Sequence, residues 1–481
     1  MPSQATVLPS PALVTEPAVD RALRSARIRT WAPIWLVAVL LGLFNSGAIA
    51  EGDVFWETRA GLDTLRGHLP QSDTYSFAVT GRAWTPNSWA WNVLLGLAWH
   101  AGRFVGLGVL SAVAIGALAS GLGWWCVRQG ASVPVTLACE VPVLLLQTQW
   151  LSPRPQLASY LLILPLFELG RFAMHQHRFT RSLLFVFLLE ALWVNLHFFG
   201  VIGVGVLAAA ALGSTGDRPH RLVRAGALVL AGAAGAAVTP TLFAAYRSAV
   251  SVRQQSVGLI DEWQHPNLHS AGGILAVITM VSVLPVLVFS VRRRRWPQSL
   301  LLALLVIGTL SAVRFGPCLA VASLPELVLA VNTVSWPRLL RPALICAASL
   351  ALLVLSVGTL RAVPHLGTAA YGPELTRQIP TGCRVLTNDL DGSLLELLRP
   401  DTKPSLDTRN DLYGRQDLVF LSDLLDDRVP TSTDAWLARN RVGCIYAPVT
   451  RNLVQRLRSD NGWRVSGIAD GQAILLSRNV H

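Results

Sequence analysis

Charged residues are scarce in this chain. Of its 481 residues, 14% are Asp, Glu, Lys or Arg, 52% are hydrophobic, and the mean hydropathy is +0.46. Soluble domains usually carry about 25% charged residues, so the shortage excludes an ordinary soluble fold. Several apolar runs reach the roughly 20 residues that cross a bilayer. The composition therefore predicts a polytopic membrane protein.

Other signals are also missing. The C-terminal part contains neither a G-x-G-x-x-G nor a P-loop pattern, which leaves nucleotide binding without support. The six cysteines lack the spacing of metal ligands, so no metal-binding residues are predicted from them. The start of the chain lacks the charged n-region and the cleavage site of a signal peptide. We expect residues 1–30, rich in Pro and Ser at their start, to be a disordered cytoplasmic N-terminus.

The net charge of +12 could indicate nucleic-acid binding. However, the arginines form short clusters between apolar runs, a distribution that the positive-inside rule explains better than a nucleic-acid groove. We therefore expect membrane lipids, and no nucleic acid, as partners.

The apolar runs predict a mainly α fold, a helical membrane bundle over residues 31–360. We predict about eleven spans. They lie near 31–50, 104–127, 132–149, 156–173, 182–197, 199–214, 225–246, 271–291, 298–313, 316–333 and 341–360. The amphipathic stretch 87–101 reads as a helix lying at the membrane interface.

Alternate connections between these spans are basic. They contain Arg128, then Arg171, Arg178 and Arg181, then Arg218, Arg221 and Arg224, then Arg292–Arg295, then Arg338 and Arg341. This alternation predicts a multi-pass protein of the plasma membrane with a cytoplasmic N-terminus and an extracytoplasmic C-terminus.

The remaining connections carry acids, imidazoles and single arginines. They are the outer loop 51–86, and the segments around Arg154, around Asn195 and His197, around Glu262 and Trp263, and around Arg314. Each lone arginine could instead snorkel to lipid head groups or cap a helix. Together, these polar residues on one side of a bundle predict a polar cavity.

From about residue 361 onward the composition changes, and short strands alternate with helices. Residues 361–481 therefore predict a small extracytoplasmic α/β domain with a mostly parallel sheet and a terminal hairpin. Cys383 and Cys444 each lie at a predicted strand. They could form a disulfide in an oxidising compartment, or both could be core residues.

Several segments resemble a known family. The stretch "GDVFWETRAGLDTLRGHLPQSDTYSFAVTGRAWTPNSWAW" resembles the first outer loop of bacterial polytopic membrane proteins of the C-type glycosyltransferase superfamily. "SPRPQLASY", "LWVNLHFFGVIG", "EWQHPNLHS", "VRFGPCLAVASLPEL" and "SLDTRNDLYG" continue the likeness in order, and it covers nearly the whole chain after about residue 30.

The resemblance implies a sugar donor carried on a polyprenyl phosphate and a glycan, lipid or protein acceptor. It also implies that a carboxylate of the first outer loop is the catalytic base, for which Asp53 is the first candidate and Glu51 the second. Relatives often have a His after the aromatic pair, where this chain has Glu57. This departure weakens the case for a divalent metal and makes Glu57 a possible substitute.

The chemistry of transfer from a lipid phosphate suggests roles for the other polar residues. Arginines stabilise an anionic leaving group. The expected substrate-binding residues are Glu57, Arg59, Arg154, Asn195, His197, Glu262, Trp263 and Arg314. Trp56 and Trp263 suit stacking on a sugar, whereas Trp84 and Trp89 are more typical of membrane anchors.

Two hypotheses follow for the function. The first is a membrane glycosyltransferase that transfers a hexosyl or pentosyl group at the outer face. The alternative is a non-enzymatic transporter of lipid-linked glycans or a scaffold of envelope assembly. A transporter would be expected to show internal repeats, and none is evident. The enzyme hypothesis requires Asp53 to lie within about 15 Å of Arg154 or Arg314.

Overall fold

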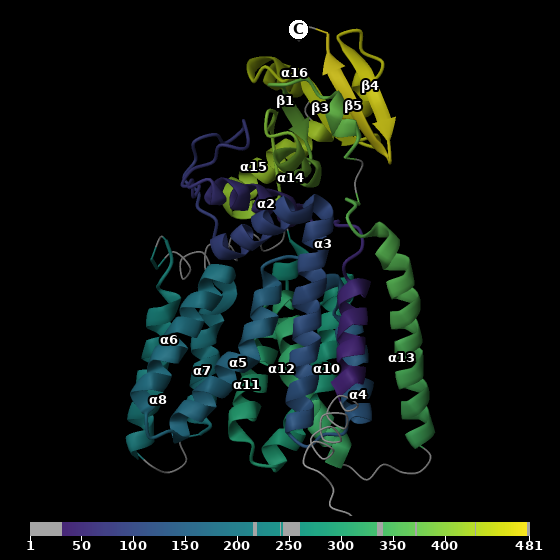
Figure 1. The fold of residues 1–481 in the computed structure, drawn as a ribbon. Helices are drawn as coiled ribbons and strands as arrows, with labels where there is room; N and C mark the ends of the chain where they lie inside the picture. Colours follow the sequence, from purple (N-terminus) through teal and green to yellow (C-terminus); the bar gives the residue numbers. More distant parts are fainter. Residues whose placement is uncertain are drawn as a thin grey trace, which may run out of the picture.

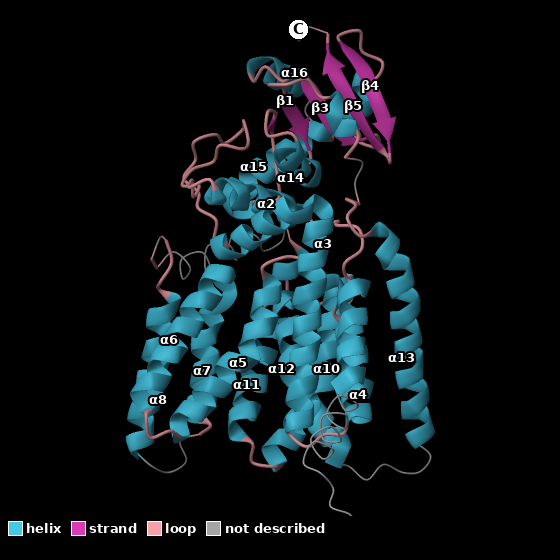
Figure 2. Cartoon of the chain, in the orientation of Figure 1, coloured by secondary structure: helices cyan, strands magenta, loops and turns pink. Residues whose placement is uncertain are grey.

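The computed structural model describes residues 31–214, 219–240, 242–243, 260–333, 340–370, 373–428 and 430–478. In these ranges most residues are helical, and the strands lie only between residues 384 and 477 (Figure 2). We call the part of the chain from residue 373 onward the C-terminal unit. The long helices stand side by side as a bundle, and the C-terminal unit lies beyond one end of that bundle (Figure 1). We call this the cavity end. The N-terminal segment 1–30, expected to be disordered, falls outside the described residues.

The bundle is built from apolar helices. They are Trp31–Phe44, the second part of α3 (Trp89–Arg128), α4 (Val133–Leu146), α5 (Gln156–His175), α6 (Phe179–Leu196), α7 (Gly203–Leu212), α8 (Pro219–Ala236), α10 (Ala271–Arg292), α11 (Trp296–Ser311), α12 (Gly316–Thr333) and α13 (Leu340–Ala362). Six helices among the described residues are long and apolar enough to cross a membrane, with four shorter apolar helices beside them. The chain is therefore a membrane protein, but the predicted count of about eleven spans is not confirmed.

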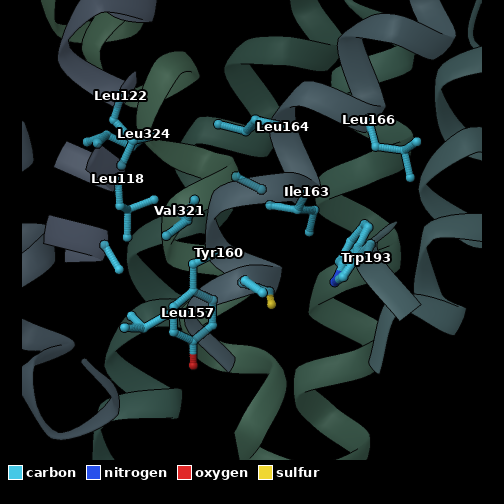
Figure 3. Packing of buried hydrophobic residues seen from close by; sticks show 14 of the residues in the cluster. Leu118, Leu122, Leu157, Tyr160, Ile163, Leu164, Leu166, Trp193, Val321 and Leu324 are labelled. Atoms are coloured by element: carbon cyan, nitrogen blue, oxygen red, sulfur yellow. The ribbon is translucent and has the colours of Figure 1, made fainter. Parts of the chain in front are cut away.

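The bundle core and its surface are both apolar. Tyr160 and Ile163 of α5 pack in the interior with Trp193 of α6 and Val321 of α12 (Figure 3). On the other side of α6, Leu184, Leu188 and Leu192 recur every four residues and are 56%, 51% and 50% exposed. A helix that is apolar all round is typical of a lipid environment.

Two helices lie between the bundle and the C-terminal unit. Helix α3 breaks at Gly102 and Arg103, where the backbone is not helical, close to the predicted end of the short helix 87–101. Helix α2 (Gly52–Leu65) packs against the first part of α3. A Cβ at Gly61 would lie 1.7 Å from the carbonyl oxygen of Asn92, so the crossing requires glycine at this position.

The C-terminal unit contains a five-stranded sheet in the order β2-β1-β3-β5-β4. The strands are β1 (Arg384–Thr387), β2 (Lys403–Pro404), β3 (Cys444–Pro448), β4 (Trp463–Ala469) and β5 (Gln472–Ser477). The helices are α14 (Asp389–Leu398), α15 (Asn410–Leu425), α16 (Pro430–Arg439) and α17 (Asn452–Leu457). The first three strands in space pair in parallel, whereas β3, β5 and β4 pair antiparallel. The sheet is thus mixed rather than mostly parallel, because the terminal hairpin adds to its edge.

A disulfide joins Cys383 to Cys444. It connects the residue before β1 to the first residue of the neighbouring strand β3, and both cysteines are buried. Of the two alternatives for this pair, the structure contains the disulfide, and it lies within the core.

A fully buried arginine fastens the C-terminal unit to the loop between α2 and α3. Nη2 of Arg409 lies 2.8 Å from Asp73 of that loop, 2.6 Å from Asp407 and 3.3 Å from Glu396. Burial and the neighbouring Asp407 raise the pKa of Glu396, which favours the protonated form of this side chain in the cluster.

The ring of Trp84 lies against the same guanidinium, 4.6 Å from its centre. Trp84 is only 6% exposed and belongs to a buried cluster with Trp56 and Tyr75. The expectation that Trp84 is a membrane anchor is therefore wrong, because this side chain packs inside the protein.

The substitution Arg409→Met should destabilise the protein strongly. It would leave the acids of Asp73 and Asp407 buried without their cation, which typically costs about 3–5 kcal/mol. Arg428→Met is the matched control, since Arg428 pairs with Asp423 at the surface, where such a pair contributes about 0–1 kcal/mol. Thermal unfolding of the detergent-solubilised variants checks this, and equal midpoints for Arg409→Met and Arg428→Met would contradict it.

Candidate active site

A cavity of about 280 Å³ lies between the bundle and the C-terminal unit. Its walls come from the start of α2, the segments before α5 and α12, the end of α6, the loop before α10 and the segment before α15. Eight of the predicted site residues line it: Glu51, Asp53, Glu57, Arg154, His197, Glu262, Trp263 and Arg314. Residues more than 200 positions apart in the sequence therefore meet in one place.

Arg154 lies at the centre of the acidic part of the cavity. Its Nη2 is 2.7 Å from Asp53 Oδ2, and its Nη1 is 2.7 Å from Glu262 Oε1 and 3.6 Å from Glu51 Oε2. The other oxygen of Asp53 accepts a hydrogen bond from Trp56 Nε1 at 3.3 Å. Asp53 is thus held in one orientation by a cation and a ring donor.

The acids of the cavity have pKa values that are shifted in different directions by their surroundings. Burial opposes ionisation of Glu262, but Arg154 and Arg314 hold its pKa below the usual value. Burial raises the pKa of Glu51 and, more strongly, that of Glu57, which also lies near the charge of Asp53. The two arginines therefore favour the ionised form of Glu262, whereas burial favours the protonated form of Glu57.

Glu57 is 4% exposed, and its Oε2 has no hydrogen-bond partner among the described residues. It lies four positions after Asp53 on α2, so the two side chains share one face of that helix. A protonated carboxyl group on this face is a hydrogen-bond donor beside the Asp53 carboxylate.

Arg314 is buried against aromatic rings. The centre of its guanidinium lies 4.2 Å from the ring of Trp263, 5.3 Å from that of Phe199 and 5.9 Å from that of Phe198. In the described part of the chain, Arg314 makes no ion pair within 4.0 Å, in contrast to Arg154 and Arg409. A stacked guanidinium without a carboxylate partner is suited to bind an anion from outside the protein.

His197 lies in the cavity wall at the end of a chain of hydrogen bonds. Trp193 Nε1 donates to Ser159 Oγ at 2.8 Å, and Ser159 Oγ lies 2.7 Å from His197 Nδ1. With Trp193 as its donor, Ser159 can give its own hydrogen to Nδ1. A neutral imidazole then carries its proton on Nε2 and can donate a hydrogen bond.

Two predicted residues lie away from the cavity. Arg59 pairs with Asp63 at 3.1 Å on α2. Asn195 donates to the carbonyl oxygens of Ala191 and Val238 and accepts a hydrogen bond from Trp89. The structure does not bring either side chain to the other site residues.

The C-terminal unit contributes lining residues that sequence reasoning missed. The polar ones are Thr408, Arg409, Asn410 and Asp411, all within the segment "SLDTRNDLYG", and Leu390 of α14 also lines the cavity. Burial raises the pKa of Asp411 to about 6. The sequence offers one signal for these residues, the resemblance of their segment to the family. That resemblance does not predict that the segment lines the cavity.

The carboxylates of the cavity do not form a metal site in the described residues. No group of three His, Cys, Asp or Glu side chains there is arranged to hold an ion. Instead, Asp53, Glu262 and Glu51 surround the guanidinium of Arg154. We therefore derive no step through a metal ion.

The chain is thus a helical membrane protein with a polar cavity between its bundle and a small α/β unit. Two solved structures have a similar fold. The chain is similar to the oligosaccharyltransferase of Archaeoglobus fulgidus in its apo form, with a TM-score of 0.56 and 12% identity over 87% of this chain and 69% of that one. It is also similar to apo ArnT from Cupriavidus metallidurans, with a TM-score of 0.54 and 11% identity over 94% of this chain and 98% of that one. No family model and no curated protein matches the sequence.

Both neighbours have the C-type glycosyltransferase fold, and this chain shares it. The resemblance noted in the sequence is confirmed at the level of the fold. Identities of 11–12% show a common fold and no more than that.

The variant Glu57→Gln should change how stability depends on pH. Because the pKa of Glu57 in the folded protein lies well above 4.5, the protonated side chain contributes its full stability below about pH 4.5. That contribution is lost as the pH rises toward the folded pKa. Glutamine keeps a neutral side chain at every pH, so the variant should gain stability relative to the wild type with rising pH.

Thermal unfolding midpoints measured from pH 4.5 upward test this expectation. Glu374→Gln removes one exposed carboxylate from the surface and serves as the control. Parallel curves for the wild type and Glu57→Gln would contradict a raised pKa for Glu57.

Proposed function

We propose that the chain is a membrane glycosyltransferase that transfers a sugar from a polyprenyl-phosphate donor to an acceptor hydroxyl or amide. The observation that carries the proposal is Arg314, a buried cation without an ion pair in the described residues, in the same cavity as the oriented carboxylate of Asp53. A phosphate is the anion that such a guanidinium binds well, since its donors match two phosphate oxygens.

Asp53 is the proposed base. In this reaction its carboxylate takes the proton of the acceptor, and the acceptor atom forms a bond to the anomeric carbon of the sugar. The bond between that carbon and the phosphate oxygen breaks, and the polyprenyl phosphate leaves with the electron pair. Attack from the side opposite the phosphate inverts the anomeric configuration. General-base assistance of this kind contributes typically 10²–10⁴-fold in rate.

The cations of the cavity would stabilise the leaving group. Arg314 would hold the phosphate as negative charge develops on it, and His197 Nε2 could donate a further hydrogen bond. Arg154 already balances Asp53 and Glu262, so its proposed role is to orient Asp53 and to add positive potential.

The proposed location is the plasma membrane, with the N-terminus in the cytoplasm and the cavity at the outer face. Arg171 and Arg292 lie near the far ends of α5 and α10, away from the segments that line the cavity, as the positive-inside rule requires for this orientation. The disulfide between Cys383 and Cys444 supports an oxidising compartment for the C-terminal unit. The acceptor would be a glycan, lipid or protein of the cell envelope.

The substitution Asp53→Asn should strongly reduce the rate of transfer while leaving the fold intact. We expect a loss of about 10²–10⁴-fold in rate, because asparagine cannot take the proton of the acceptor. The measurement is sugar transfer in membranes or nanodiscs with a panel of polyprenyl-phosphate hexoses and pentoses as donors.

Asp63→Asn is the matched control. Asp63 lies on the same helix, where it pairs with Arg59 and Arg66 away from the cavity. Its loss should leave transfer near the wild-type rate. Transfer by Asp53→Asn at the wild-type rate would remove Asp53 as the base. No transfer by the wild type with any donor would favour a transporter or scaffold.

A further inference from the structure

A second cavity of about 280 Å³ adjoins the proposed active site. It lies at the cavity end of the bundle, between residues 44–51, the second part of α3 and the segment 148–153. The two cavities share Ala50 and Glu51 in their walls. The two cavities are therefore neighbours, with the residues just before Asp53 in the walls of both, and we call the second cavity the side chamber.

The wall of the side chamber differs in character from that of the active site. Its polar side chains are the uncharged Asn45, Ser46, Ser111, Thr148, Gln149 and Ser152. Phe44, Ile49 and Leu151 supply apolar surface. Among the described residues, Glu51, at the boundary, is the only charged residue of this wall, and no cation lines it.

Two polar atoms in this wall lack hydrogen-bond partners among the described residues. They are Oγ of Ser111, a side chain that is 1% exposed, and Oδ1 of Asn45. Asn45 uses its Nδ2 to donate to the carbonyl oxygen of Leu41 at 2.8 Å, which leaves Oδ1 as an acceptor. Buried polar atoms without partners are rare in folded proteins, and a bound water or ligand is one way in which their hydrogen bonds are completed.

We propose that the side chamber is the subsite for an uncharged sugar ring. A pyranose or furanose has hydroxyl groups that both donate and accept, which suits hydroxyl and amide side chains, and C–H faces that suit the apolar part of the wall. The part of the wall that the structure describes has no cation to balance an acidic sugar, and burying an unpaired carboxylate would be costly. The volume lies just below the 300–1,000 Å³ typical of drug-sized ligands, as expected for a single ring.

Glu51 is placed to join the two cavities. Its side chain is 38% exposed and lies 3.6 Å from Nη1 of Arg154, beside Asp53. A ring in the side chamber would therefore have one edge at Glu51. This geometry assigns Glu51 the role of binding a sugar hydroxyl rather than that of the base.

The inference rests on the proposed function for the direction of transfer, but not for the chemistry of the ligand. The ring could be the transferred sugar of the donor, or a sugar of the acceptor. Both are uncharged glycosyl groups and would make the same contacts, so the experiment has to separate these two sources.

The test uses the full chain in nanodiscs and two variants, Ser111→Ala and Asn45→Leu. The first removes a hydroxyl without adding volume, and the second replaces an amide with an apolar group of similar size. The control is Ser323→Ala, a buried serine of α12 that does not line either cavity and whose Oγ donates to Ala320 at 2.9 Å. The probes are polyprenyl phosphate alone, polyprenyl-phosphate hexoses and pentoses, and free methyl glycosides added with saturating polyprenyl phosphate.

If the ring belongs to the donor, both variants should bind sugar-bearing lipid about 5- to 10-fold more weakly than the wild type, with unchanged binding of polyprenyl phosphate alone. If it belongs to the acceptor, the same loss should be seen with methyl glycosides instead. In either case Ser323→Ala should behave as the wild type, and a methyl glycoside of a uronic acid should not bind.

Binding of all sugar probes at wild-type affinity by both variants would overturn the subsite. Retained binding of polyprenyl phosphate would then leave the proposed function standing. Failure of the wild type to bind any polyprenyl phosphate would instead contradict the proposed function, and in that case the methyl glycosides, tested without lipid, would still decide the subsite.

Discussion

The ion pairs of Arg154 determine how this cavity is built. The guanidinium contacts Asp53 and Glu51 at the start of α2 and Glu262 in the loop before α10, so it joins three segments that are far apart in the sequence. These acids balance the charge of Arg154, and Arg409, another cation of the wall, is likewise paired with acids. Arg314 is the arginine of the wall whose donors stay available within the described residues. This division between paired arginines and one available arginine gives the cavity its capacity to bind an anion. Removing one of the acid partners of Arg154 would leave that guanidinium to compete for the same anion.

Arg409 is a third arginine of the cavity wall, on the side formed by the C-terminal unit. Arg409 holds the C-terminal unit on the loop between α2 and α3 through Asp73, and its neighbours Thr408, Asn410 and Asp411 face the cavity. The contact is close at α2 as well, since a Cβ at Gly52 would lie 2.7 Å from Thr408. The C-terminal unit is therefore a wall of the site as well as an appendage of the bundle. Its strands and disulfide give that wall a rigid support, which fixed positions of the lining side chains require.

The sequence predicted much of the site because the alternation of basic loops separates two sides of a bundle. Arg154, His197, Glu262 and Arg314 were grouped by that rule, and they do meet. The positive-inside rule assigns each loop to one side of the membrane, but it does not predict in which direction a side chain on a helix points. Arg59 comes two residues after Glu57 on α2, which turns its side chain roughly 200° away, toward Asp63. The prediction that Trp84 anchors the protein in the membrane is wrong for a related reason. The local sequence around a tryptophan is the same whether its ring faces lipid or, as here, a buried arginine. The docking of the C-terminal unit depends on contacts such as Arg409 with Asp73, 336 positions apart, which no local pattern contains.

The most direct test of the account is a structure of the chain in nanodiscs with bound polyprenyl phosphate. The account predicts that the phosphate lies in the cavity beside Asp53, with its oxygens within hydrogen-bonding distance of Arg314 and the lipid chain running into the bilayer. A phosphate bound instead at the opposite end of the bundle, near the arginines 292–295, would contradict it. So would a cavity that remains free of phosphate at saturating lipid.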